Sequence, residues 1–182
     1  MPASSDAGVK ALLAGQKVYV ANGITTAQDG RVMPEGWPAL AELAKRGTSL
    51  IDTVALISDE RDWPGEVRAL IGKDYAGRVR IGGVKLTIDG SPQGRTAWLH
   101  DPVTIPPEGK GADYRGYPAI DLGLFNARLK AAADNGWPVF VHVNGDEAMQ
   151  ALIDGVRANG LSDKRTIAIH AQVTRPEQLE AM

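Results

Sequence analysis

Three side chains with metal-binding chemistry stand at or near the ends of three apolar runs. Lys85 lies in VRIGGVKLTID, His142 lies in PVFVHVNGD, and His170 closes RTIAIH. A buried ammonium group needs a partner, a lowered pKa or a chemical role, and a neutral imidazole is a nitrogen ligand suited to zinc. If the runs are neighbouring parallel strands about 4.8 Å apart, the two histidines can share one metal ion.

The lysine can join such a site by reacting with carbon dioxide. Burial lowers the pKa of a lysine amine, and the deprotonated amine adds carbon dioxide to become a carbamate. A carbamate is an anionic ligand with two oxygens, and it can bridge two divalent metal ions. The positive metal ions would in turn stabilise the charge buried at Lys85.

Each of these residues also has a simpler structural interpretation. A single histidine on an apolar strand is more often a hydrogen-bonded core residue than a ligand, and this applies to both His142 and His170. Lys85 can extend from the end of its strand to solvent. The functional hypothesis therefore depends on the occurrence of all three residues on successive strands.

Other polar residues near the strand ends are expected to have local roles. Asp146 is predicted to cap the N-terminus of the following helix. Thr174 and Glu177 have the spacing of a capping box, and Asp89 and Arg95 can form an ion pair within a loop. Thr174 and Glu177 are therefore not candidates for catalysis.

Helical and strand-like segments alternate along the chain. Apolar residues recur at helical spacing over 9–20, 63–71, 122–129 and 149–156, and a glycine after three of these segments suits a left-handed C-cap. Short β-rich runs lie between the helices, at 24–27, 50–57, 79–88, 139–143 and 166–169. This order predicts a parallel sheet built from βα units, in a single domain spanning 1–182.

Two architectures fit this pattern, an open doubly wound sheet and a closed (β/α)₈ barrel. Five strands are too few to close a barrel of eight. A doubly wound nucleotide-binding domain would carry a Gly-rich phosphate loop, yet no G-x-G-x-x-G follows any of the runs. The pattern by itself leaves the choice open. The Gly- and Pro-rich segment 89–119 is long enough to predict a functional loop.

Composition excludes several classes of function. The chain has 182 residues, 43% of them hydrophobic and 23% charged, which is typical of a globular protein. Its net charge of −2 gives no basic surface for nucleic acid or an anionic membrane. The absence of cysteine excludes disulfides, zinc–thiolate sites and a thiol nucleophile. Because the N-terminus lacks the pattern of a signal peptide, we expect a cytoplasmic protein.

Four segments resemble the metal-dependent amidohydrolase superfamily. They are GITTAQDG (23–30), GGVKLTIDGSPQGRTAWL (82–99), VHVNGDEAM (141–149) and IHAQVTRPEQLEAM (169–182). The branch they resemble most is amidohydrolase family 3, which includes enzymes similar to N-substituted formamide deformylase. The resemblance covers nearly the whole chain, in the order of the family.

The resemblance implies a fold, a metal site and a reaction. The family has a (β/α)₈ TIM barrel beside a small β-sandwich, and the five runs would be barrel strands 2 to 6. By position, Lys85 would be the carboxylated lysine, with His142 and His170 as the metal ligands on strands 5 and 6. The reaction implied is hydrolysis of a C–N bond in a small amide, formamide or cyclic amide, with one or two divalent ions, most simply zinc. The substrate contacts implied are Asp89, Arg95 and Asn144.

The sequence also departs from the family pattern. It has no H-x-H pair, which the family places on strand 1, and it ends before the strand that would carry the general-base aspartate. We therefore expect a central fragment of the barrel that is inactive alone, holds an unmodified Lys85 and self-associates through its open sheet edges. The alternative is a non-catalytic α/β binding or regulatory domain in which the lysine and histidines are structural.

Overall fold

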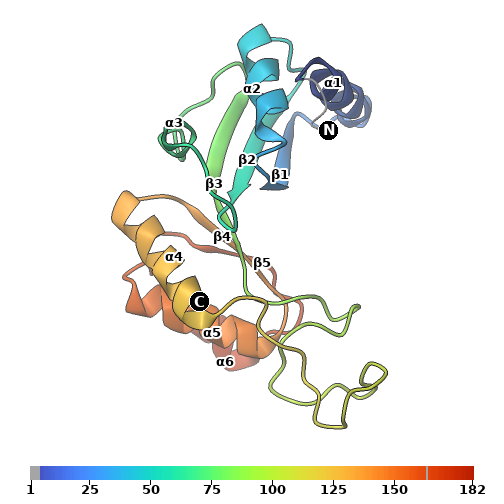
Figure 1. The fold of residues 1–182 in the computed structure, drawn as a ribbon, viewed down its shortest axis with the longest axis vertical. Helices are drawn as coiled ribbons and strands as arrows, with labels where there is room; N and C mark the ends of the chain where they lie inside the picture. Colours follow the sequence, from blue (N-terminus) through green and yellow to red (C-terminus); the bar gives the residue numbers. More distant parts are fainter. Residues whose placement is uncertain (1–4, 163) are drawn as a thin grey trace. The chain divides into compact units, whose positions relative to one another are not determined.

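The computed structural model describes residues 5–162 and 164–182. The chain divides into two compact units, Met1–Lys85 and Leu86–Met182, and each is described by itself. Figure 1 labels the helices and strands of both.

Unit 1 contains three parallel strands with helices between them. Its elements are α1 (Ser5–Ala21), β1 (Thr26–Val32), α2 (Trp37–Arg46), β2 (Asp52–Ser58), α3 (Gly65–Arg68) and nearly all of β3 (Val79–Thr87). β2 pairs with β1 on one side and with β3 on the other. The residues of β2 from Thr53 to Ser58 are all buried, as expected of a central strand that is covered on both faces.

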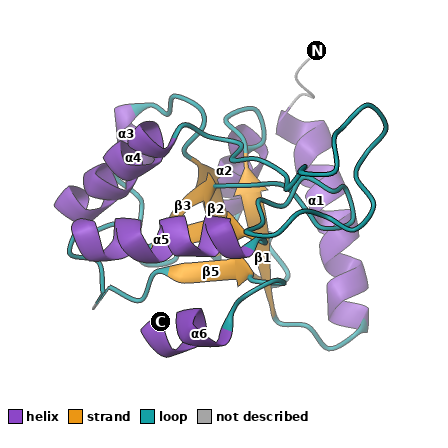
Figure 2. Cartoon of the chain, turned by 90° about the horizontal axis from the view of Figure 1, so that it is seen from below, coloured by secondary structure: helices purple, strands orange, loops and turns teal. Residues whose placement is uncertain are grey.

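Unit 2 contains the end of β3 and two further strands. Its elements are α4 (Leu122–Asn135), β4 (Val139–Val143), α5 (Asp146–Ala158), β5 (Ile167–His170) and α6 (Pro176–Ala181). The Ile88 amide donates to the His142 carbonyl, and β4 pairs in parallel with β5. α4 and α5 pack side by side (Figures 1 and 2), and their buried faces include Phe125, Leu129 and Met149.

The strands form a sheet in the order β1-β2-β3-β4-β5, so every strand lies beside its neighbour in sequence. A doubly wound sheet reverses its strand order at a switch point, whereas a (β/α)₈ barrel adds strands one after another. The sequential order therefore confirms the partial TIM-barrel prediction.

One predicted helix is much shorter than its apolar spacing suggested. The pattern over 63–71 predicts a helix, but α3 has only four residues. Ile71 instead forms a bridge with Ile81, and the Gly72 amide donates to the Ile81 carbonyl. The apolar residue Ile71 is therefore buried against β3 in an extended segment rather than on a helix.

Both predicted helix caps were wrong by one residue. Gly145 is the N-cap of α5, while Asp146 is its first helical residue. At α6 the N-cap is Arg175, whose amide donates to Oε1 of Gln178, 3.0 Å away. The side chains predicted to cap these helices have other partners. Asp146 Oδ1 accepts from the His100 amide, and Thr174 Oγ1 donates to the Ala171 carbonyl.

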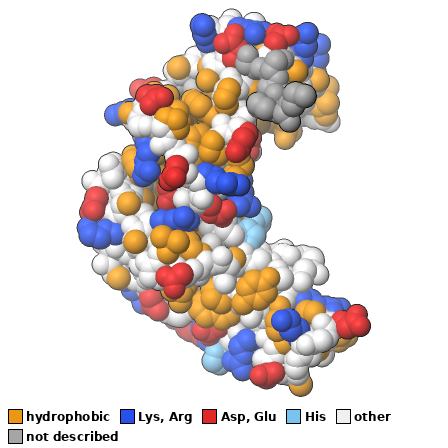
Figure 3. All heavy atoms as spheres, viewed as in Figure 1, with side chains coloured by type: hydrophobic (Ala, Val, Ile, Leu, Met, Phe, Trp, Pro, Cys, Tyr) orange, Lys and Arg blue, Asp and Glu red, His pale blue; other side chains and the backbone are white. Residues whose placement is uncertain are grey.

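The surface shows no concentration of one charge on the face seen in Figure 3, where acidic and basic side chains are interspersed. This agrees with the net charge of −2. Among the described residues, no helix combines the length and the apolar character needed to cross a membrane.

Gly145 is expected to tolerate no side chain. A Cβ at this residue would lie 1.9 Å from the Trp98 carbonyl oxygen and 2.4 Å from its carbon. The Trp98 amide is itself bound to the Asp89 carboxylate, so this backbone cannot move without breaking a buried hydrogen bond. We expect Gly145→Ala to lower the free energy of unfolding by about 2–4 kcal/mol in urea titrations.

Gly15→Ala is the matched control for this prediction. Gly15 lies inside α1, and a Cβ there would meet nothing within 4 Å. Because alanine is the better helix former, this variant should gain about 0.5–1 kcal/mol. Equal effects of the two substitutions would show that the close approach to Trp98 is unimportant.

Candidate active site

Lys85 lies in β3 near the carboxyl end of the strand. It pairs with Ser58 of β2, and its carbonyl accepts from the Asp59 amide at 3.1 Å. Lys85 is 6% exposed, so the expected extension of its side chain to solvent does not occur. A charged amine at this depth is costly.

The surroundings of Lys85 favour the neutral amine. Burial and, to a smaller extent, the positive charge of Arg31 lower its pKa from 10.5 to about 8, and Glu60 acts in the opposite direction. Arg31 and Glu60 form an ion pair with each other. A lysine with this pKa has a substantial neutral population near pH 8, and only the neutral amine can add carbon dioxide.

His142 and His170 meet at the carboxyl ends of β4 and β5. Their ring centroids lie 4.7 Å apart, with the ring planes at 74°. Two imidazoles this close, on adjacent parallel strands, can turn a nitrogen each toward one ion. The structure therefore brings together the two predicted histidine ligands.

The backbone of β5 explains how the two rings come together. His170 pairs with Val143, while His142 pairs with Ile169. Because paired residues of a parallel sheet point to the same face, regular strands would place the two imidazoles on opposite faces. His170 and Ala171 instead have left-handed φ angles of 76° and 48°. Such strained residues cluster at functional sites, and here the distortion lets the His170 ring face His142.

The hydrogen bonding of His142 fits a metal ligand. Its Nε2 lies 2.7 Å from the Gly90 carbonyl oxygen. Asn144 Nδ2 lies 3.1 Å from the same nitrogen. Because a carbonyl only accepts, the shorter contact to Gly90 favours a hydrogen on Nε2, and the unprotonated Nδ1 then keeps the lone pair that a metal requires. Asn144 Nδ2 donates to the same carbonyl at 2.8 Å.

The three predicted substrate contacts have different surroundings. The Asp89 carboxylate is buried and accepts hydrogen bonds from backbone amides. Asn144 Oδ1 is buried with no hydrogen-bond partner in the described part of the chain. Arg95 donates to the Pro106 carbonyl rather than to Asp89, and it lines a cavity of about 330 Å³. The predicted ion pair between Asp89 and Arg95 is therefore absent among the described residues.

Lys85 belongs to unit 1 and the histidines belong to unit 2. Their convergence on one ion therefore stays a prediction. Within residues 5–162 and 164–182, no group of three or more His, Cys, Asp and Glu side chains is arranged to hold a metal ion. The imidazole pair supplies two nitrogen ligands, and a complete site needs further ligands such as a carbamate.

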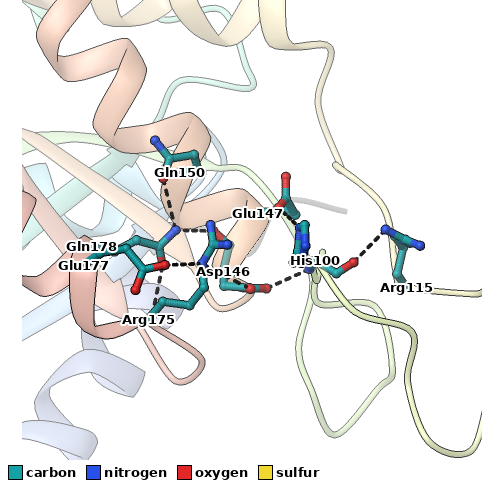
Figure 4. A network of polar contacts seen from close by, with 8 residues as sticks. All are labelled: His100, Arg115, Asp146, Glu147, Gln150, Arg175, Glu177 and Gln178. Carbon is teal, nitrogen blue, oxygen red and sulfur yellow. Dashed lines mark hydrogen bonds and ion pairs between the residues drawn. The ribbon is translucent and has the colours of Figure 1, made fainter.

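A network that the sequence analysis did not anticipate joins the long loop to α5 and α6 (Figure 4). His100 Nδ1 lies 2.8 Å from Glu147 Oε1, and the His100 amide donates to Asp146. Asp146 in turn pairs with Arg175 at 3.5 Å. The acidic residues that begin α5, Asp146 and Glu147, were a signal for such contacts, but their partner His100 is 46 and 47 residues away in sequence. The network holds the 89–119 segment beside the ends of the strands.

Comparisons with known proteins agree with this fold. The model of the amidohydrolase family matches residues 1–182. The chain is 30% identical over 106 residues to the Bacillus subtilis (strain 168) protein named "Putative amidohydrolase YtcJ", covering 56% of this chain and 18% of that protein. The matched region thus spans about a fifth of that relative's length.

Two solved structures of archaeal proteins are also similar. Both are described as uncharacterized metal-dependent hydrolases. The one from Pyrococcus horikoshii OT3 has a TM-score of 0.82 and 24% identity, covering 98% of this chain and 35% of that one. The one from Pyrococcus furiosus has a TM-score of 0.77 and 28% identity, covering 92% and 34%. Since the family model extends over every residue, the chain belongs to the amidohydrolase family.

Proposed function

We propose that this chain is the central part of a metal-dependent hydrolase that cleaves a C–N bond in an amide, formamide or cyclic amide. The observation that carries the proposal is the pair of facing imidazoles, His142 and His170, at the ends of adjacent strands in a member of the amidohydrolase family. N-substituted formamides are the first substrates to test, because the sequence segments resemble that branch.

Each residue has a proposed role. His142 and His170 would hold a divalent ion, zinc in the simplest case, and Lys85 as a carbamate would supply a further, anionic ligand for one or two such ions. A metal ion bound there would lower the pKa of a water molecule and polarise the substrate carbonyl. Asn144 would accept a hydrogen bond from the substrate through its buried Oδ1, and Arg95 would contact the substrate from the loop.

The general base is proposed to be an aspartate supplied by a longer hydrolase that carries this chain. We accordingly expect the 182 residues alone to be inactive and Lys85 to be unmodified in them. β1 and β5 each have a neighbour on only one side, so we also expect self-association, measurable by light scattering. A cytoplasmic location is part of the same proposal.

The proposal is tested by comparing metal dependence in the longer hydrolase and in this chain. The longer protein is stripped with a chelator, resupplied with zinc, manganese or cobalt, and assayed on N-substituted formamides and cyclic amides. We expect hydrolysis that disappears with the metal and returns on its addition, with none from the 182 residues. Hydrolysis that persists after complete metal removal would contradict the metal-dependent mechanism.

A further inference from the structure

The Asp89 carboxylate organises the segments around His142. Its Oδ2 accepts from the Trp98 amide at 2.9 Å and from the Gly145 amide at 2.8 Å. Its Oδ1 accepts from the Asn144 amide at 3.0 Å. The residue is 1% exposed, so a buried anion with three amide donors joins the end of β3, the returning loop and the turn after β4.

These contacts leave Asp89 little capacity to touch a substrate. Both of its oxygens already accept hydrogen bonds, and its side chain is closed off from solvent. Breaking them would leave buried amides without partners, which is costly. Asp89 therefore binds backbone amides of the protein rather than a substrate.

The carbonyl that contacts His142 belongs to the residue after Asp89. The Gly90 oxygen accepts from His142 Nε2 and from Asn144 Nδ2. The Gly90 amide donates to the Thr96 carbonyl at 3.1 Å, and a Cβ at Gly90 would lie 1.9 Å from Thr96 Oγ1. The Ser91 amide, which shares a peptide unit with this carbonyl, donates to Thr96 Oγ1 at 3.0 Å, so hydrogen bonds on both sides of Gly90 fix the direction of the carbonyl.

We propose that Asp89 is a positioning residue that, by fixing the Gly90 carbonyl, keeps the hydrogen of His142 on Nε2 and leaves Nδ1 free to bind a metal. The metal part rests on the proposed function, whereas the tautomer part does not. A metal-binding histidine commonly donates its other N–H to a carbonyl, and loss of such a partner lowers metal affinity about 10–100-fold. Asp89 acts through that carbonyl, and its own Oδ1 lies 3.8 Å from His142 Nε2, where its negative charge favours a hydrogen on the same nitrogen.

The test measures the tautomer of His142 in the metal-free, ¹⁵N-labelled chain at a pH where the ring is neutral. Long-range ¹H–¹⁵N correlation spectra separate a protonated ring nitrogen from an unprotonated one, and a His142→Gln variant assigns the signals. We expect the wild-type chain to carry the hydrogen on Nε2. A wild-type His142 with its hydrogen on Nδ1 would overturn the proposal.

Asp89→Asn then tests the role of the carboxylate, with Asp113→Asn, an exposed residue of the same loop, as the control. We expect Asp89→Asn to give a mixture of the two tautomers and zinc binding weakened about 10–100-fold in calorimetric titrations. Asp113→Asn should leave both unchanged. Should Asp89→Asn not fold, Asp89→Glu, which keeps the charge but displaces it by one methylene, is expected to shift the tautomers in the same direction.

The outcomes separate this inference from the proposed function. A folded Asp89→Asn or Asp89→Glu variant with an unchanged His142 tautomer would refute the positioning role. In one outcome, His142 shows the expected tautomers in the wild type and the Asp89 variants while neither this chain nor the longer hydrolase binds zinc. That result would support the positioning role and count against the metal-dependent function.

Discussion

The Lys85→Met variant is expected to be more stable than the natural chain but to inactivate the hydrolase that carries it. Lys85 is 6% exposed, and its pKa is lowered from 10.5 to about 8, chiefly by burial. A difference of this size corresponds to about 3 kcal/mol of unfolding free energy. Methionine has a similar shape and no charge, so we expect a gain of roughly 1–3 kcal/mol at pH 7.

The stability of the natural chain should depend on pH in a defined direction. Below pH 8 the amine is charged in both states, and the folded state bears the full cost of burying it. Between pH 8 and 10.5 the unfolded chain binds the proton more tightly than the folded one, so the contribution of Lys85 to stability rises with pH in this window. Above pH 10.5 the amine is neutral in both states and the cost is gone.

Urea titrations across this pH range check the prediction, with Lys130→Met as the control. Lys130 is an exposed partner of Asp134, so its loss should change stability by less than about 0.5 kcal/mol. The advantage of Lys85→Met over wild type should shrink from pH 8 to 10.5. If Lys85→Met were less stable than wild type at pH 7, Lys85 would be a structural residue with favourable contacts rather than a strained functional one.

His142→Ala and His170→Ala are expected to abolish metal binding and hydrolysis in the hydrolase that carries this chain. Their rings lie 4.7 Å apart and supply both imidazoles of the proposed site. Loss of a residue that only hydrogen-bonds to a metal ligand typically weakens metal affinity about 10–100-fold. Removing the ligand itself should have a larger effect, so we expect metal affinity to fall by more than about 100-fold. Calorimetric zinc titration and kcat/KM measure the two consequences.

His100→Ala provides the matched control, because His100 is the third histidine of the chain. Its ring is exposed and contacts Glu147 on the surface of unit 2. We expect this substitution to leave metal affinity unchanged. Comparable losses from all three alanine variants would mean that zinc binds to histidines without a defined site.

The fold was largely predictable because its signals are local. Apolar runs marked β2 to β5, whereas the run at 24–27 overlaps only the first two residues of β1, whose sequence is mostly polar. The glycines after α4 and α5 marked where those helices end. The helix over 63–71 was overestimated, because the spacing of its apolar residues did not reveal that Ile71 would pair with Ile81. The caps were misplaced by one residue, since Asp146 is held by the amide of His100, 46 residues away.

The closeness of His142 and His170 was predictable, but its geometry was not. The chemistry of histidine and the ends of parallel strands pointed to His142 and His170. Their meeting depends on the left-handed backbone at His170, and no sequence rule places a non-glycine residue there. The role of Asp89 was also hidden, because its partners are backbone amides up to 56 residues away that any sequence would provide.

Anomalous diffraction at the zinc edge tests the central claim most directly. The crystals would contain the hydrolase that carries this chain, grown with zinc and bicarbonate. We predict a peak about 2.0–2.1 Å from His142 Nδ1 and from a ring nitrogen of His170, beside a carbamate on Lys85. An occupied zinc site that touches none of these three residues, or well-ordered crystals without any zinc peak, would contradict it.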